Sequence, residues 1–309
     1  MRLIKPSFSI WDQQEGLEGI YKQIERAGRV CYKSEDKITE DSAKDFVDRM
    51  IKLGHGAMLE HGTVYLKLSD SLVRGVQIAD EIFYKYKKNP YSKYHYSNID
   101  GVFTGYVTTN YRVLIENNWL DDLKYLCEPT EFHEKRVCVR FICDRGVSHE
   151  YVRHRVFSFA QESTRYCNYS KDKFGNELTF ILPPWVDERQ LGEQNSQELL
   201  IQMGSLSNPT YTQEDLNELY FLFSLASSEV QYFNLINNGW KPQEARAVLP
   251  NSLKTELVVT GFVSDWEHFF ELRDAGSAHP QARELAHLLH MEFLRRKYLV
   301  SLYDEANPD

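Results

Sequence analysis

Hydrophobic residues recur along the chain at two spacings, and the two spacings alternate without a regular order. At 39–53 they recur at helical spacing, with Thr39 available to cap the start of a helix and Gly54 to end it. At 63–68 and 136–141 every second residue is apolar, which predicts strands. Asp144 then stands where it would cap a short helix that runs to about Val152.

The C-terminal third carries the clearest patterns, which predict four helices and one buried strand. These are a helix that Thr212 caps and that ends near Gly239, a helix with Pro242 in its first turn, a buried strand at 257–259, a helix that Ser264 caps and that runs through Phe270, and a last amphipathic helix that begins at Pro280. Because helices and strands interleave irregularly, we expect an α+β fold. No repeat or Gly/Ser linker divides the chain, so we expect one domain over 1–309.

Composition limits the class of protein. The chain has 309 residues, of which 42% are hydrophobic, and none of its apolar stretches approaches the roughly 20 residues of a membrane span. Residues 1–6 lack the long apolar run of a signal peptide, so we expect a cytoplasmic protein without membrane contact. The five cysteines form no CxxC pair, and we interpret them as small buried residues.

Charge is distributed unevenly along the chain. The formal net charge of −9 disfavours general binding of nucleic acid, because phosphates need cations. Against this background, the Arg-His-Arg of residues 153–155 and the nearby Arg165 form a dense cationic segment. Because such charges repel one another, we interpret the segment as a site for an anion, which arginine grips through its planar fork. The alternative is a solvated basic face paired to Glu150 and Glu162.

One metal-binding pattern overlaps this segment. His149 and Glu150, followed by His154, look like the zinc-protease pattern H-E-x-x-H with one residue too many. At about 100° per helical residue, a spacing of five turns the second ring about 140° away from the first. Two such rings cannot bind one metal from a regular helix, so we expect no metal.

The spacing within the cationic segment is more specific than its charge. Residues 153–165 fit R-H-R-x-x-S-x-x-x-x-S-x-R, which resembles the defining motif of flavin-dependent thymidylate synthases, the thymidylate synthase complementing protein family. Further segments similar to those of the family occur in the same order, at 54–61, 245–250, 268–273 and 278–281. Together these segments extend the resemblance over about 53–281.

The resemblance implies a reaction, its cofactors and an assembly. It implies reductive methylation of dUMP to dTMP, with methylene-tetrahydrofolate as carbon donor and NADPH-reduced FAD as hydride donor. It also implies a homotetramer in which FAD lies between subunits. The partners expected are therefore further copies of this chain and small molecules, with no nucleic acid and no membrane.

The resemblance also implies roles for residues of this chain. Those that would bind FAD are His55, Arg153, His154, Arg155, Gln161 and His268. Those that would bind dUMP are Glu150, Arg153, Gln161, Ser163, Arg165, Arg246 and Arg273. Arg273 would be the catalytic residue, because a guanidinium at the uracil edge favours ionised N3 and raises electron density at C5.

Four positions depart from the family pattern. Phe262 and Ser264 stand where many members carry an Asn and an Arg that contact flavin, and Ala57 stands where a Ser or Thr is usual. Glu150 replaces a Gln near dUMP. The flavin pocket would then be built differently. A flavin- or nucleotide-binding homologue without synthase activity is therefore an alternative.

The stretch at about 82–132 is longer than in compact members, and we interpret it as an insertion. Tyrosines and lysines interleave at 84–96, a composition that binds single-stranded nucleic acid in other proteins. The other interpretation is an exposed insertion whose lysine stems cover tyrosine rings, with a subunit contact or folate entry as its role. A nucleic-acid-binding module is thus a second alternative.

Overall fold

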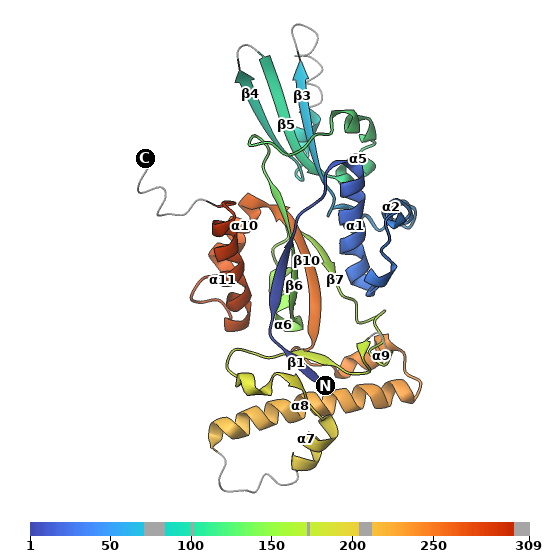
Figure 1. Cartoon of the computed structure of the whole chain (residues 1–309), viewed down its shortest axis with the longest axis vertical. Helices are drawn as coiled ribbons and strands as arrows, with labels where there is room; N and C mark the ends of the chain where they lie inside the picture. The colour runs from blue at the N-terminus through green and yellow to red at the C-terminus, as the bar shows by residue number, and fades with distance from the viewer. Residues whose placement is uncertain (71–83, 100–101, 172–173, 204–211, 300–309) are drawn as a thin grey trace.

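The computed structural model describes residues 1–70, 84–99, 102–171, 174–203 and 212–299 (Figure 1). The middle of the molecule is an antiparallel sheet of order β2-β6-β10-β7. Its strands are β2 (Ser7–Trp11), β6 (Arg136–Asp144), β10 (Lys254–Phe262) and β7 (Ser158–Gln161). The strands expected at 136–141 and 257–259 are confirmed, and both are longer than predicted.

Helices cover both faces of this sheet because its strands carry apolar residues on both sides. On one face, α6 (Arg145–Tyr151), α10 (Val263–Arg273) and α11 (Pro280–Arg295) pack on the alternating Val137, Val139 and Phe141 of β6. On the other face, α1 (Gly16–Tyr32) packs through Ala27 and Val30 against β6 and β10. Figure 1 shows α1 and the α10–α11 pair on opposite sides of the sheet.

A second antiparallel sheet, of order β3-β5-β4, extends beyond one end of the first (Figure 1). Its strands are β3 (Thr63–Asp70), β5 (Val102–Asn110) and β4 (Lys93–Ile99), and β3 confirms the strand expected at 63–68. Nearby in the chain, η1 (Glu35–Lys37) and α2 (Ser42–Lys52) pack on α1, α3 (Gly56–Leu59) precedes β3, and α5 (Tyr111–Glu116) and η2 (Leu120–Tyr125) follow β5. Strands β4 and β5 thus occupy part of the stretch that sequence patterns left unassigned.

The third sheet, of order β8-β1-β9, closes the opposite end. Its strands are β8 (Thr179–Ile181), β1 (Arg2–Ile4) and β9 (Gly192–Glu193). The helices there are η4 (Glu188–Gln190), α7 (Ser196–Met203), α8 (Gln213–Asn237), α9 (Pro242–Ala245) and η5 (Arg246–Val248). They enclose a separate apolar cluster that includes Phe180, Phe223 and Tyr232. The overall class is α+β, as expected.

Side-chain caps mark the start of some of the described helices. Thr212 accepts from the Asp215 N–H at 3.1 Å, and Asp144 accepts from the Val147 N–H at 2.8 Å, so both predicted caps are confirmed. Two other predicted caps are wrong. Helix α2 begins at Ser42 rather than at Thr39. Helix α10 begins one residue before Ser264, and the Asp265 carboxylate accepts from the Phe262 N–H at 3.1 Å.

Two further features bear on the class of protein. Among the residues that the structure describes, no helix combines the length and apolar character needed to span a membrane. All five cysteines are free thiols, and Cys138, Cys143 and Cys167 are buried.

Candidate functional site

The cationic segment begins where α6 ends. The chain continues in helical turns, with the Arg153 N–H bonded to Glu150 O at 3.2 Å and the His154 N–H bonded to Tyr151 O at 3.2 Å. It then enters β7, which pairs with β10 from Ser158 to Gln161. The segment therefore lies at the corner between the end of α6 and the start of β7. The sequence indicated this position, because Asp144 was expected to cap a short helix just before Arg153.

Arg273, the last residue of α10, joins this corner through three hydrogen bonds. Its Nε donates to His154 Nε2 at 3.0 Å, its Nη1 to the Glu150 carboxylate at 2.9 Å and its Nη2 to Glu150 O at 2.9 Å. The structure thus brings together three predicted site residues from α6, the following loop and α10. Glu150, which replaces a Gln of the family pattern, is the carboxylate partner of Arg273.

His154 is buried between aromatic rings. Its ring centroid lies 5.0 Å from that of Phe269 and 6.1 Å from those of Phe157 and His268. Burial, and then the charges of Arg273 and His268, lower the pKa of His154 to about 4. The ring is therefore neutral at pH 7, and its Nε2 accepts the hydrogen bond from Arg273. His154 acts here as an acceptor that fixes Arg273 rather than as a cation.

The end of β7 is fixed by hydrogen bonds to its neighbours. The Gln161 amide donates to Ser148 Oγ at 2.9 Å and to Thr255 Oγ1 at 3.3 Å, which ties β7 to α6 and β10. The Ser163 N–H donates to Cys31 O at 3.1 Å, at the end of α1. Both residues are half-buried.

The other predicted arginines of the site are exposed. Arg153, Arg155, Arg165 and Arg246 all reach solvent, and Arg246 Nη1 donates to Thr164 Oγ1 at 3.2 Å beside Arg165. Within the described residues, no carboxylate lies within 4 Å of any of these four guanidinium groups. The interpretation that Glu150 and Glu162 pair with the basic face is wrong, because Glu150 pairs with Arg273 and Glu162 with Lys254.

His268 and His55 lie at the edges of this arrangement. His268 is exposed on α10 and lies 3.1 Å from a Glu271 carboxylate oxygen. His55 is exposed immediately before α3. Met58 of α3 contacts Cys31, with a sulfur–sulfur distance of 3.9 Å. Because Cys31 also bonds Ser163, the α3 segment connects to the end of β7, but within the described residues no hydrogen bond or ion pair joins His55 to Arg273 or His154.

Two of the positions that depart from the family pattern, Phe262 and Ser264, lie close to Lys93 of the second sheet and to the start of β6. The buried Phe262 ring lies 5.5 Å from Lys93 Nζ and 5.5 Å from Arg136 Cζ. Ser264 Oγ donates to a Glu134 carboxylate oxygen at 2.5 Å. Ala57 is exposed on α3. Of the two residues that replace the usual Asn and Arg, Phe262 therefore contacts Lys93 of β4, and Ser264 contacts Glu134 just before β6.

The Tyr/Lys stretch near β4 shows lysines over aromatic rings. Lys88 Nζ lies 4.1 Å from the Tyr84 ring centroid, and Lys87 Nζ lies 5.8 Å from that of Tyr94. These contacts favour the interpretation of an exposed insertion whose lysines cover tyrosines. The part of that prediction that falls before Tyr84 lies outside the described residues.

Sequence patterns missed a buried network of charges beside the motif. Lys254 donates to Glu162 at 2.8 Å and to Glu256 at 2.7 Å. Glu256 also accepts from Arg140 Nε at 2.7 Å and pairs with Lys33. Burial raises the pKa of Glu256, but Lys254 and Lys33 outweigh burial and lower it to about 2. The sequence feature that could have predicted this network is the presence of charged residues within the otherwise apolar strands β6 and β10.

Metal ligands are not grouped in the described ranges: no set of three or more His, Cys, Asp or Glu there could hold a metal ion. Glu150 and His154 are instead engaged with Arg273. The chemistry that this arrangement supports is recognition of anions by guanidinium groups, with Arg273 fixed by His154 and Glu150.

Comparison with protein families gives a match over more than half of the chain. The model described as "Thymidylate synthase complementing protein" matches residues 117–296, which include the motif, Arg246 and Arg273.

Individual relatives are similar over different shares of their length. A flavin-dependent thymidylate synthase of Mycobacterium avium is 35% identical over 152 residues, which cover 49% of this chain and 53% of that protein. One of Corynebacterium aurimucosum is 25% identical over 279 residues, covering 89% and 76%. One of Pyrococcus furiosus is 28% identical over 156 residues, covering 50% and 52%. The chain thus spans about half the length of several relatives that it matches.

Among solved structures, one similar chain is that of the UMP/dUMP methylase PolB from Streptomyces cacaoi bound with 5-Br dUMP. It is 15% identical, the match covers 96% of this chain and 93% of that one, and the TM-score is 0.39. A likeness of this degree carries no argument about the site.

Proposed function

Since this chain belongs to the thymidylate synthase complementing protein family, we propose that it is a flavin-dependent enzyme that methylates the uracil ring of dUMP. The family match confirms the resemblance of the motif at 153–165. The reaction would be reductive methylation of dUMP to dTMP, with methylene-tetrahydrofolate as carbon donor and NADPH as reductant of FAD. Flavin dependence is also in the names of the similar proteins.

One observation carries the proposal: the motif arginines have no anionic partner within the described chain. Arg153, Arg155 and Arg165 lie within thirteen residues, and no carboxylate of the described part is within 4 Å of any of them. Neighbouring permanent cations repel one another, and an anion bound among them removes that repulsion. Phosphate groups of FAD and dUMP fit guanidinium forks bidentately.

These residues suit FAD, whose pyrophosphate needs cationic donors. We assign Arg153 and Arg155 to its phosphates, with His154, His55, Gln161 and His268 toward the flavin side. When bound, the flavin supplies the hydride that completes the methyl group. The protein supplies position and charge. Phe262 and Ser264 do not offer the usual amide and guanidinium, so the family's two contacts there have no counterpart in this chain.

Ser163, Arg165 and Arg246 are assigned to the dUMP phosphate, with Glu150, Arg153, Gln161 and Arg273 around the nucleotide. Arg273 has N–H donors that its bonds to His154 and Glu150 do not use. Arginine carries five N–H groups, and the three bonds to His154 and Glu150 use one each, so two remain. Aimed at the uracil edge, they would stabilise negative charge on N3 and O4 as C5 attacks the carbon donor.

The proposal includes a homotetramer with FAD between subunits and a cytoplasmic location. The exposed arginines support the assembly, because ligands held by Arg153 and Arg155 in a single chain would be open to water on one side. A second chain would close that side. Mass measurement of the purified protein tests this part separately from the chemistry.

The decisive experiment uses the purified full chain. Its visible absorbance should show flavin bands, and dTMP should form only when dUMP, methylene-tetrahydrofolate and NADPH are all present. Omission of each substrate in turn is the control. Yellow protein without dTMP would favour the inactive homologue. Colourless protein that takes up no added FAD, but binds single-stranded nucleic acid with steep salt dependence, would favour the nucleic-acid module.

A further inference from the structure

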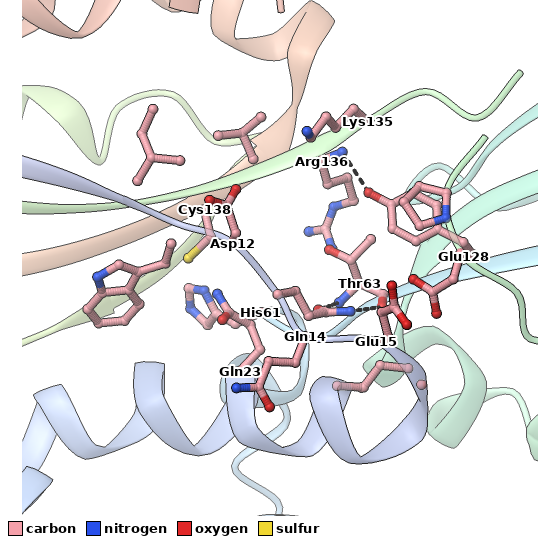
Figure 2. Close-up of a pocket in the computed structure, with 18 of the residues that line it drawn as sticks. Asp12, Gln14, Glu15, Gln23, His61, Thr63, Glu128, Lys135, Arg136 and Cys138 are labelled. Carbon is pink, nitrogen blue, oxygen red and sulfur yellow. Dashed lines mark hydrogen bonds between the residues drawn. The ribbon is translucent and has the colours of Figure 1, made fainter. Parts of the chain in front are cut away.

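A cavity of about 280 Å³ lies where the second sheet joins the body of the protein. Its walls come from the β2–α1 connection, α1, the start of β3, residues 126–129, the start of β6, and Tyr298. Figure 2 shows the side chains of Arg136, His61, Cys138 and Gln23 around this space, from β6, α1 and the turn before β3. None of them was assigned to the proposed reaction.

Arg136 is a buried cation without an anionic partner. Its side chain lines the cavity, and the residue is 8% exposed. Its Nη1 donates to Glu60 O at 3.1 Å and to Thr63 Oγ1 at 3.2 Å, and its Nη2 donates to Ser158 Oγ at 3.4 Å. All three acceptors are neutral, and no carboxylate of the described chain lies within 4 Å of the guanidinium. Its Nε has no partner.

Another arginine of the same chain shows what burial usually requires. Arg29 is also 8% exposed, and it pairs with the buried Glu25 at 2.7 Å. Burying a charge costs several kcal/mol unless an opposite charge and hydrogen bonds compensate. Arg29 has that compensation in a direct ion pair, whereas Arg136 has hydrogen bonds to neutral groups, and the carboxylates of Glu60 and Asp265 act on it only from beyond 4 Å.

Two more donors or acceptors are left unpaired at the same place. The structure records eight buried side-chain nitrogen or oxygen atoms without a hydrogen-bond partner in its described part, and three belong to residues that line this cavity. They are Gln23 Nε2, His61 Nε2 and Arg136 Nε. The other ring nitrogen of His61 is engaged, since its Nδ1 lies 2.8 Å from Thr260 Oγ1. Three nitrogens without a hydrogen-bond partner thus belong to residues around one space.

We propose that this cavity binds the carboxylate of a small organic acid, with Arg136 as its counter-ion and Gln23 and His61 as further hydrogen-bond partners. The exposed residues at the mouth limit the charge of the ligand: Asp12, Glu15 and Glu128 lie there with Lys135, and Asp12 pairs with Arg296 at 3.3 Å. Three carboxylates repel a phosphate dianion more strongly than a monoanion. Apolar walls at Ile20, Leu126 and Val137 suit a short hydrocarbon body.

Acetate is the probe for the test, with the purified full chain. Isothermal titration at constant ionic strength should show saturable binding of sodium acetate at one site. Sodium chloride should give no such signal, and inorganic phosphate should bind at least tenfold more weakly. A map from crystals grown with acetate should show the ion beside Arg136. Phosphate binding as tightly as acetate would overturn the choice of ligand class, and water alone beside Arg136 would overturn the site.

The test is made specific by comparing variants that should weaken acetate binding with one that should not. Arg136→Met should weaken acetate binding by at least about tenfold, as expected for a hydrogen bond to a charged group. Arg136→Met also removes three hydrogen bonds within the protein, so it can affect folding as well as binding. Gln23→Leu is therefore the second test, and it should weaken acetate binding roughly two- to tenfold. Glu128→Gln at the mouth is the matched control and should leave acetate binding equal or tighter. Equal acetate binding by the wild type and Gln23→Leu would overturn the proposal.

Discussion

Arg273 Nε donates a hydrogen bond of 3.0 Å to His154 Nε2, and the two residues are 119 positions apart in the sequence. The bond ties the end of α10 to the loop after α6. It also settles the state of the imidazole, because a nitrogen that accepts from a guanidinium carries no proton. The motif histidine is thus neutral, and the guanidinium is fixed on two sides by His154 and Glu150.

Replacing Arg273 should remove turnover but retain flavin. In Arg273→Ala, the proposed stabilisation of charge on the uracil edge is lost, so dTMP formation should fall to background. FAD should remain bound, because its phosphates are assigned to Arg153 and Arg155. The measurements are dTMP formation per flavin and the flavin absorbance of the purified variant. Arg283→Ala is the control, since Arg283 is an exposed arginine that bonds Asp274 O at 3.1 Å. Loss of flavin with unchanged turnover per holoenzyme would refute the role of Arg273.

The imidazole of His154 should stay neutral well below neutral pH. Burial, then Arg273 and His268, lower its pKa to about 4, so NMR titration should find no protonation between pH 7 and 5. In Arg273→Ala the pKa should rise, because one repelling charge is gone. Since the folded pKa is below the usual 6.5, this group's contribution to stability is full above pH 6.5 and is lost as pH falls toward 4. A pKa unchanged by Arg273→Ala would mean that burial alone sets it.

The sequence patterns predicted local elements well where caps and periodicity agreed. Thr212 and Asp144 form the predicted caps, and β3, β6 and β10 follow the alternation of apolar residues. One of the wrong caps, Ser264, lies beside a competing residue: Asp265 bonds the Phe262 N–H, and α10 starts earlier. Local spacing does not say which of two nearby polar residues is used.

Contacts between distant segments were beyond those patterns. The motif indicated an anion site, but the pairing of Glu150 with Arg273 depends on how α10 packs on α6. Likewise, Glu162 looked like a surface partner of the motif arginines, and the fold buries it against Lys254 of β10. Strand β6 carries Arg140 among apolar residues, and only the pairing of β6 with β10 explains why a charge is tolerated there.

Arg165→Ala should raise the concentration of dUMP required for half-maximal rate. A hydrogen bond to a charged group contributes about 1.5–3 kcal/mol, which corresponds to roughly ten- to hundredfold in affinity. The rate at saturating dUMP should change less. Arg189→Ala is the matched control, because Arg189 is an exposed arginine paired with Asp187 at 2.8 Å. The same dUMP requirement in Arg165→Ala and wild type would remove Arg165 from the phosphate site.

Glu150→Gln should change how the rate depends on pH. The carboxylate offsets part of the positive charge of Arg273, to which it is bonded at 2.9 Å. With a neutral amide in its place, Arg273 should stabilise ionised N3 more strongly, so the rising limb of the pH–rate profile should move to lower pH. The amide oxygen still accepts from Nη1, which keeps the geometry. A profile that moves to higher pH would show that Glu150 itself acts on the base.

Lys254→Met should destabilise the folded chain at neutral pH by about 3–5 kcal/mol, because it leaves Glu162 without its nearest cation in a buried place. Lys44→Met is the control, since Lys44 and Asp48 form an exposed pair and its loss should change stability little.

The pH dependence of this stability difference has a definite sign. The folded pKa of Glu256 is about 2, below its usual 4.5, so the stability it contributes is full above pH 4.5 and is lost as pH falls toward 2. Denaturant unfolding at pH 7, 5, 4 and 3 should therefore show the gap between Lys254→Met and wild type shrinking below pH 4.5. A gap that stays constant to pH 3 would mean that Lys254 stabilises the strands by packing of its stem rather than by its charge.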